Sequence, residues 1–264
     1  MSLVKLHILP FSLLSLLFIA QAFAGQTGCP DHFVDGQAPD FINEKLSLKS
    51  KEICYSGFAL KHSGVTRTPL YAAEYLTREH LTQAGGLKRS SKFYPDPSLL
   101  PSERAELRHY ARSGYDRGHV APSGDMPNPE SQQECFTLAN MVPQIPSVNR
   151  GVWERVEAAT RKLARERGGV FVVTGPIYSG ATVQKIGGAV MVPTKMFKAV
   201  YDPLRNECGA NIVDNVEGGE VQVVTIAELE KLSGISVFPS LSSQIKNNGM
   251  RLPAALERKQ RGGV

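Results

Sequence analysis

Short apolar runs recur along the chain and predict the strands of a sheet. Three of them, residues 53–60, 70–77 and 170–174, have strand composition, and Gly64 marks a turn between the first two. Four further strands are expected at residues 189–192, 196–201, 222–226 and 235–238. The runs therefore predict a central sheet, against which any helices of the chain would pack.

A different period, with apolar residues three and four positions apart, appears at residues 151–167 and predicts a helix. The repeat is carried by Val152, Val156, Ala159 and Leu163. A glycine pair at 168–169 ends this helix. Shorter helices are expected at residues 102–110, where Ser102 would be the N-cap, and at residues 227–232.

The connecting segments are rich in Gly, Ser and Pro, most clearly at residues 25–52 and 85–101. A basic, glycine-ended tail starts at Arg251, and neither a repeat nor a linker divides the sequence. Strands and helices mixed in this order predict the α/β class, as one domain over residues 25–264. The sequence has neither a glycine-rich phosphate loop nor the GxSxG motif of a serine hydrolase.

The composition is that of an ordinary globular protein. Of 264 residues, 42% are hydrophobic and 21% charged, which excludes a disordered chain, a collagen and a multi-span membrane protein. The chain has 30 Lys and Arg against 25 Asp and Glu, a formal net charge of +5. This modest excess permits binding of a polyanion but does not require it.

The first 24 residues predict a secretory signal peptide. Lys5 precedes the mostly apolar run Leu6–Ala20, and Ala22 to Ala24 form a small-residue cleavage pattern. The alternative is a retained membrane anchor, but the run is short for a membrane span and Pro10 interrupts it. We expect cleavage after Ala24, export to the periplasm or the medium, and no stable membrane association afterwards.

Export would favour disulfide bonds among the four cysteines. Their even number predicts two bonds with three alternative pairings. From sequence order alone we expect Cys29 to pair with Cys54 and Cys135 with Cys208. Four reduced, buried thiols are the alternative.

The segment Tyr115–His119 combines an acid, an arginine and a histidine. In an extended strand Arg117 and His119 lie on one side, because residues two apart share a face. A guanidinium can bind phosphate oxygens in pairs, and an imidazole can take a proton from water near neutral pH. This pattern suits hydrolysis of a phosphate ester. The alternative is a surface histidine beside an arginine that pairs with Asp116.

A second polar cluster follows at Asn140–Gln144, Asn149–Trp153 and Glu157. Asn149 stands at the start of the expected helix, where it would serve either as a cap or as an oxygen ligand for Mg²⁺. Glu157 lies two turns further on and could hold a water molecule of the metal. Its simpler role is an ion pair with Arg161.

The order of these motifs resembles a known family. Asp-Arg-Gly-His from residue 116, Asn-x-x-Pro-Gln from residue 140 and Asn-x-x-x-Trp-x-x-x-Glu from residue 149 are similar to the DNA/RNA non-specific endonucleases. That family includes secreted bacterial sugar-nonspecific nucleases and mitochondrial endonuclease G. Residues 173–178 and 193–198 resemble its next two strands. The similarity covers about residues 54–240.

The resemblance implies a ββα-metal active site on a central, mostly antiparallel sheet flanked by helices. It implies that His119 is the general base and Asn149 the single direct protein ligand of Mg²⁺. Arg117 would bind phosphate, and Glu157 would hold a water molecule of the metal. An upstream arginine that stabilises the transition state matches Arg89.

Two further positions, Asp116 and Asn140, match residues that support the site. The implied function is a magnesium-dependent endonuclease that cuts double- and single-stranded DNA and RNA to 5′-phosphate products, as a monomer or a homodimer. Mn²⁺ or another divalent cation could replace Mg²⁺. Lys195 and Lys198 are candidates for substrate binding, or else solvated strand residues. The alternative functions are a non-catalytic nucleic-acid-binding protein and a phosphodiesterase for smaller substrates.

Overall fold

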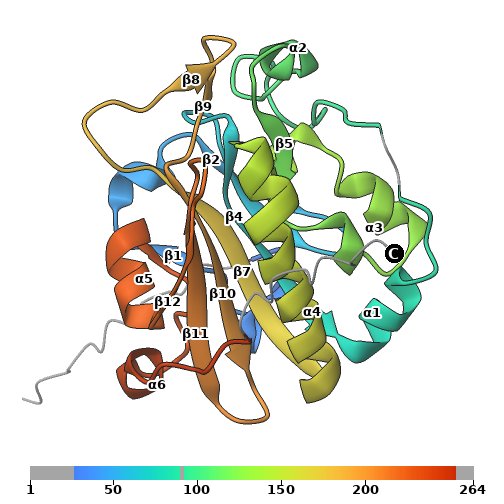
Figure 1. The fold of residues 1–264 in the computed structure, drawn as a ribbon, viewed down its shortest axis with the longest axis vertical. Helices are drawn as coiled ribbons and strands as arrows, with labels where there is room; N and C mark the ends of the chain where they lie inside the picture. The colour runs from blue at the N-terminus through green and yellow to red at the C-terminus, as the bar shows by residue number, and fades with distance from the viewer. Residues whose placement is uncertain (1–26, 90–91, 254–264) are drawn as a thin grey trace, which may run out of the picture.

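The computed structural model describes residues 27–89 and 92–253, so the expected signal peptide and the end of the C-terminal tail lie outside the described residues. A seven-stranded sheet forms the centre, in the order β12-β11-β10-β7-β4-β3-β2, and every neighbouring pair is antiparallel (Figure 1). Its strands are β2 (Ser50–Cys54), β3 (Ala59–Ser63), β4 (Thr68–Thr77), β7 (Gly169–Ile177), β10 (Lys195–Asp202), β11 (Glu207–Asp214) and β12 (Val221–Val224). The predicted α/β class and the predominantly antiparallel sheet are confirmed.

Three two-stranded ribbons and six α-helices surround this sheet in the described ranges. The ribbons are β1 (Asp40–Phe41) with β13 (Ile235–Ser236), β5 (Asp116–His119) with β6 (Met141–Gln144), and β8 (Lys185–Ile186) with β9 (Val190–Met191). The helices are α1 (Arg78–Ala84), α2 (Leu107–Tyr110), α3 (Pro129–Glu134), α4 (Glu154–Arg167), α5 (Ile226–Ser233) and α6 (Ser243–Asn247). None of these helices combines the length and the apolarity that crossing a bilayer requires.

The two faces of the sheet are covered by different elements. On β10, Phe197 and Ala199 point to one face, where they pack with Ile226 and Leu229 of α5. Met196 points to the other face, on which α4 lies (Figure 1). Successive strand residues point to opposite faces, so each central strand supplies both cores. We call these the α5 face and the α4 face.

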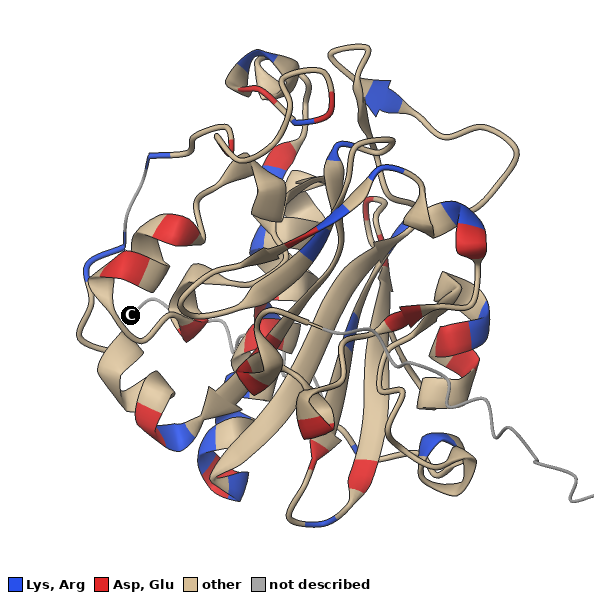
Figure 2. Cartoon of the chain, turned by 180° about the vertical axis from the view of Figure 1, so that it is seen from behind, with Lys and Arg blue, Asp and Glu red and all other residues tan. Residues whose placement is uncertain are grey.

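Charged residues are sparse on the central strands and are concentrated on the helices and loops (Figure 2). Among the exceptions, Glu74 of β4 and Lys198 of β10 are fully or nearly fully buried in the middle of the α4 face. A buried charge is costly unless other groups compensate it. The α4 face therefore contains more than an apolar core.

The cysteine prediction is half confirmed. Cys29 and Cys54 form a disulfide, whereas Cys135 and Cys208 are free and buried. The predicted Cys135–Cys208 bond is wrong because the two thiols lie on opposite faces of the sheet. Cys135 packs in the core of the α4 face and Cys208 in the core of the α5 face.

The strand expected at residues 53–60 is two strands. Its first residues end β2 and its last begin β3, and a tight turn joins them, in which the Tyr55 amide donates to the Phe58 carbonyl. Sequence patterning also missed β11, which is almost wholly buried. A strand that is covered on both faces lacks the alternation that reveals a half-exposed one.

The helix expected at residues 102–110 is only α2, which begins after Glu106. The side chain of Glu106 and that of His109 form a capping box, so Ser102 is not the cap. Tertiary contacts fix the preceding residues as turns. Arg104 donates to the carbonyls of Asp96 and Leu99, which holds the segment against its neighbouring loop.

Candidate active site

The ribbon of β5 and β6 carries the first part of the predicted site. Arg117 and His119 both line one cleft of about 730 Å³, as their spacing in a strand predicts. Gly118 between them packs against Gln144 of β6. A Cβ at residue 118 would lie 2.2 Å from Oε1 of Gln144, so only glycine lets the two strands approach this closely.

His119 sits at the floor of the cleft, where its side chain is enclosed by aromatic rings. Its ring lies 4.8 Å from the Phe136 ring in an edge-on contact and 5.8 Å from the Phe93 ring. Burial, with a smaller contribution from the charge of Arg89, lowers the pKa of His119 to about 3. The imidazole is therefore neutral at physiological pH, which is the form a general base needs.

The opposite wall of the cleft begins with a π-helical segment, Val148–Trp153, that runs directly into α4. Asn149 lies in this segment and lines the cleft. Its Nδ2 donates to Oδ2 of Asp116 at 2.9 Å. Because an ionised carboxylate can only accept, the amide nitrogen must face Asp116, which leaves Oδ1 of Asn149 for another partner.

Asp116 is held in the ionised form that this arrangement requires. Arg150 binds both of its carboxylate oxygens, at 2.6 Å and 2.8 Å. Burial alone would raise the pKa of Asp116, but the hydrogen bonds from Arg150 and Asn149 lower it below its ordinary value. Asp116 thus orients Asn149, and this contact is how Asp116 would support the site, as predicted.

Glu157 lies on the same wall, and its side chain is 14% exposed. Burial raises the pKa of Glu157 to about 7, although the charges of Lys198 and Arg161 oppose that rise. The predicted ion pair with Arg161 is long, at 4.0 Å. Arg161 binds Asp125 more closely, at 3.0 Å, so Glu157 keeps its oxygens available towards the cleft.

Two arginines flank His119. Arg89 lines the cleft, and its guanidinium carbon lies 5.6 Å from the centre of the Phe136 ring. The guanidinium carbon of Arg117 lies 4.4 Å from the centre of the Phe93 ring, a stacking contact that restricts its orientation. The structure thus brings Arg89 into the same cleft as His119.

Asn140 lies outside the cleft lining and fixes the backbone behind His119. Its Nδ2 donates to the carbonyls of Ala121 and Cys135, and its Oδ1 accepts from the Ala121 amide, each at 2.9 Å. The side chain is fully buried. It ties the loop after β5 to the loop before β6, which agrees with a supporting rather than a chemical position.

Neither candidate lysine lies among the residues that line the cleft. Lys195 pairs with Asp214 across β10 and β11. Lys198 is fully buried on the α4 face and therefore can neither contact a polymer substrate nor be a solvated strand residue. The sequence reveals that a strand residue is charged but not which face of the sheet it joins.

Two residues of the cleft lining, Arg150 and Arg161, were not among the predicted site residues. Asp125, which is buried and outside the lining, binds Arg161. The sequence predicts Arg161 only as an ion-pair partner of Glu157. Its spacing of four residues from Glu157 was the available signal. The contact with Asp125 joins residues 36 positions apart, and local spacing does not reveal it.

The cleft suits a magnesium ion by its donor chemistry. Mg²⁺ prefers oxygen ligands, keeps several of its waters and takes few ligands from the protein. Asn149 offers a correctly oriented amide oxygen, and Glu157 offers a carboxylate on the same wall. These residues fit the group that the motif resemblance implies.

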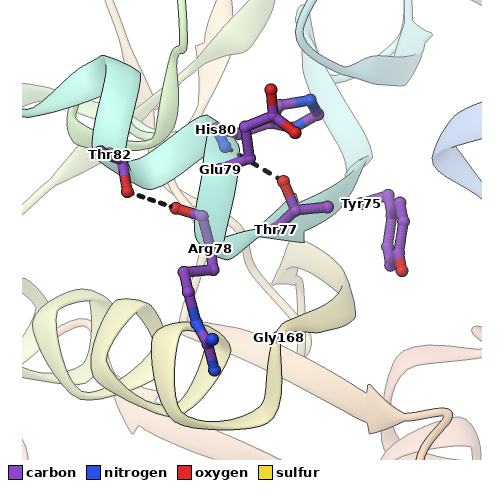
Figure 3. Close-up of a pocket in the computed structure, with 7 residues that line it drawn as sticks. All are labelled: Tyr75, Thr77, Arg78, Glu79, His80, Thr82 and Gly168. Carbon is purple, nitrogen blue, oxygen red and sulfur yellow. Dashed lines mark hydrogen bonds between the residues drawn. The ribbon is translucent and has the colours of Figure 1, made fainter.

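A second hollow lies where β4 runs into α1 (Figure 3). It is lined by Tyr75, Thr77, Arg78, Glu79, His80, Thr82 and Gly168. Thr77 accepts from the His80 amide and Thr82 donates to the Arg78 carbonyl, so these hydroxyls already serve the helix. None of the predicted site residues lies there.

The order of motifs on this scaffold has a counterpart in a known family. The family model for DNA/RNA non-specific endonuclease matches residues 37–244. The chain belongs to the DNA/RNA non-specific endonuclease family. The match includes every predicted site residue, from Arg89 to Lys198.

Among relatives, the mitochondrial nuclease EXOG of Danio rerio is 35% identical over 72% of this chain and 61% of its own length. Human EXOG is 32% identical over 80% of this chain and 66% of its own length. Human mitochondrial endonuclease G is 31% identical over 74% and 70%, respectively. The chain thus spans less than two thirds of either EXOG relative.

The fold agrees with a solved relative. A crystal structure of the EndoG/EndoGI complex, which addresses EndoG inhibition, superposes with a TM-score of 0.68 and 26% identity. The superposition covers 74% of this chain and 88% of the other chain. Architecture and motif order therefore place the chain in the endonuclease family independently of each other.

Proposed function

We propose that the chain is a magnesium-dependent, sequence-nonspecific endonuclease that hydrolyses DNA and RNA to 5′-phosphate products. One observation carries the proposal. A single cleft has the neutral His119 and Arg117 on its floor and the oriented Asn149 and Glu157 on its wall. The family to which the chain belongs supports this activity.

His119 would act as the general base. Its Nε2 is buried and has no hydrogen-bond partner among the described residues. With the ring proton on this buried Nε2, Nδ1 would be the nitrogen that takes a proton from a water molecule in the cleft. The low pKa of His119 keeps the ring neutral, so one of its two nitrogens can accept a proton, and an approaching phosphate would raise its basicity.

Arg117 and Arg89 would bind the phosphate and stabilise the charge that grows on it during the attack. Contacts to phosphate carry no sequence information, which accounts for cleavage without sequence preference in DNA and RNA. Asp116 engages Arg150 and positions Asn149.

Asn149 would bind Mg²⁺ directly, and Glu157 would hold water beside it. When bound, the ion stabilises negative charge on the phosphoryl group and on the leaving oxygen. Mn²⁺ and other divalent cations have the same oxygen preference and could replace it.

We propose further that the chain is exported, although the named relatives are mitochondrial proteins. The support is the signal-peptide pattern at residues 1–24 and the disulfide between Cys29 and Cys54, which is stable in an oxidising compartment. Fractionation of cells that make the full chain tests this, with the mature N-terminus read by mass spectrometry. A chain that keeps residues 1–24 in the reduced cytosol would contradict it.

The decisive test is digestion of plasmid DNA and of RNA by the purified mature chain, with Mg²⁺ and with EDTA. We expect both polymers to be cut only with the metal, and the product ends to become labelled by a kinase only after phosphatase treatment. Binding without cleavage would leave a non-catalytic nucleic-acid-binding protein. Cleavage of a small chromogenic diester alone would point to a phosphodiesterase.

A further inference from the structure

A lysine ammonium is sealed beneath the active site. Lys198 is fully buried on the α4 face, and its Nζ donates to Oγ1 of Thr174 at 2.6 Å. Thr174 is its direct partner across β7 and β10. One hydroxyl does not repay the burial of an ammonium, since a methionine would fill the same space at no electrostatic cost.

The carboxyl group of Glu74 is one candidate to compensate the buried charge of Lys198, but it does so only in part. It is 2% exposed on the same face, and its Oε2 has no hydrogen-bond partner among the described residues. No ion pair within 4.0 Å joins it to Lys198 in the described ranges. Burial, followed by the charge of Asp125, raises the pKa of Glu74 well above its ordinary range, so it gives Lys198 little compensating charge.

The charge of Lys198 also acts on Glu157, whose raised pKa it opposes, and the ammonium lies beside Trp153. Nζ of Lys198 lies 5.9 Å from the centre of the Trp153 ring, within the range of a cation–π contact. Trp153 is fully buried and ends the π-helical segment. It stands four residues after Asn149 and four before Glu157, at the centre of the wall that holds both.

We propose that Lys198 is a positioning residue of the active site, whose charge supports Trp153 from beneath and thereby fixes Asn149 and Glu157. The inference rests on the proposed function for what that wall does. It assigns a role in the site to a residue that never touches substrate. The buried charge of Lys198 would then serve the active site and not the stability of the fold.

The test compares Lys198→Met with the double variant Glu74→Gln/Lys198→Met. In both we expect kcat to fall about tenfold, the scale of a desolvated cation–π contact, with KM unchanged within about twofold. The magnesium concentration for half-maximal rate should rise. The control is Lys162→Met, on the outer side of α4, where the lysine is 64% exposed and pairs with Glu166.

A double variant that regains the wild-type kcat would overturn the inference, because Lys198 would then only neutralise Glu74. Full activity in Lys198→Met would overturn it as well. If Lys198→Met does not fold, kcat of the double variant tests the inference instead, because the double variant lacks the buried carboxylate of Glu74.

A second measurement keeps this inference separate from the proposed function. Trp153 is the only tryptophan in the chain, so its fluorescence reports on the wall directly. We expect Mg²⁺ to change its emission in the wild type and in Lys162→Met, and Lys198→Met to need several-fold more Mg²⁺ for the same change. If the wild type cuts no nucleic acid, the proposed function fails, and this titration still tests Lys198. Identical titration curves for Lys198→Met and the wild type would contradict the role.

Discussion

The two faces of the central sheet use the same strands for different purposes. On the α5 face β10 supplies Phe197 and Ala199 to an apolar core. On the α4 face the same strand supplies Lys198, beneath a wall that carries Asn149 and Glu157. The alternation of strand residues thus separates a stabilising face from a chemical one, and substitutions on each should have different effects.

The largest expected effect is on the chemical face. His119→Ala should lower kcat by about 10²- to 10⁴-fold, because the base is lost, while DNA binding and the melting temperature stay nearly unchanged. The α5-face control, Ile226→Val, should lower stability by about 1 kcal/mol and leave kcat unaltered. Near-normal turnover in His119→Ala would remove the base from the mechanism.

The disulfide belongs to the stabilising side of the comparison, since Cys29 packs in the core of the α5 face. It joins residues 25 positions apart, so Cys29→Ser/Cys54→Ser should lower the free energy of unfolding by about 3 kcal/mol. Urea titrations of both proteins measure this. We expect kcat at 25 °C to be unchanged, and a parallel loss of activity per folded molecule would show that the faces are coupled.

Two asparagines allow a finer separation within the chemical face. Asn149→Ala should raise the magnesium concentration for half-maximal rate by at least about tenfold, with little loss of stability. Asn140→Ala should instead lower stability by about 3 kcal/mol, because it leaves backbone groups of Ala121 and Cys135 unpaired. Magnesium and thermal titrations of both variants check this. Superimposable magnesium curves for Asn149→Ala and the wild type would make Asn149 a helix residue only.

The smallest effect is on the pH profile. Glu157 has a pKa of about 7, so its carboxylate forms as the pH rises through 7, whereas His119, with a pKa of about 3, is already neutral. We expect kcat/KM to fall below pH 7 because Glu157 is protonated. More Mg²⁺ should move this midpoint to lower pH, because a cation favours the anion. A midpoint that does not respond to Mg²⁺ would assign it to another group.

The sequence predicted those parts of the molecule that are determined locally. Arg117 and His119 share a face because they lie two residues apart in one strand, and Asn149 and Glu157 share a wall because one helical segment carries both. The strand patterns also predicted a central sheet, and the family resemblance implied its mostly antiparallel order. The family resemblance supplied the roles that spacing alone left open.

What the sequence did not predict depends on which side of the sheet a residue occupies. Lys198 and Cys208 lie on strands whose facing is set by pairing with distant strands. The position of Arg161 depends on Asp125, from a separate segment. A pattern along one strand is equally consistent with a side chain on either face of the sheet. It therefore did not distinguish a buried lysine from a lysine that could contact the substrate.

The π-helical segment at Val148–Trp153 also limits how this protein can change in evolution. A π turn contains one residue more than an α turn, so it resembles a single-residue insertion at the start of a helix. Deleting one residue there would restore an α-helix and could preserve the fold, but it would rotate Asn149 away from Glu157. Length variants in this family should therefore be confined to loops, while this segment keeps its length wherever the metal site is retained.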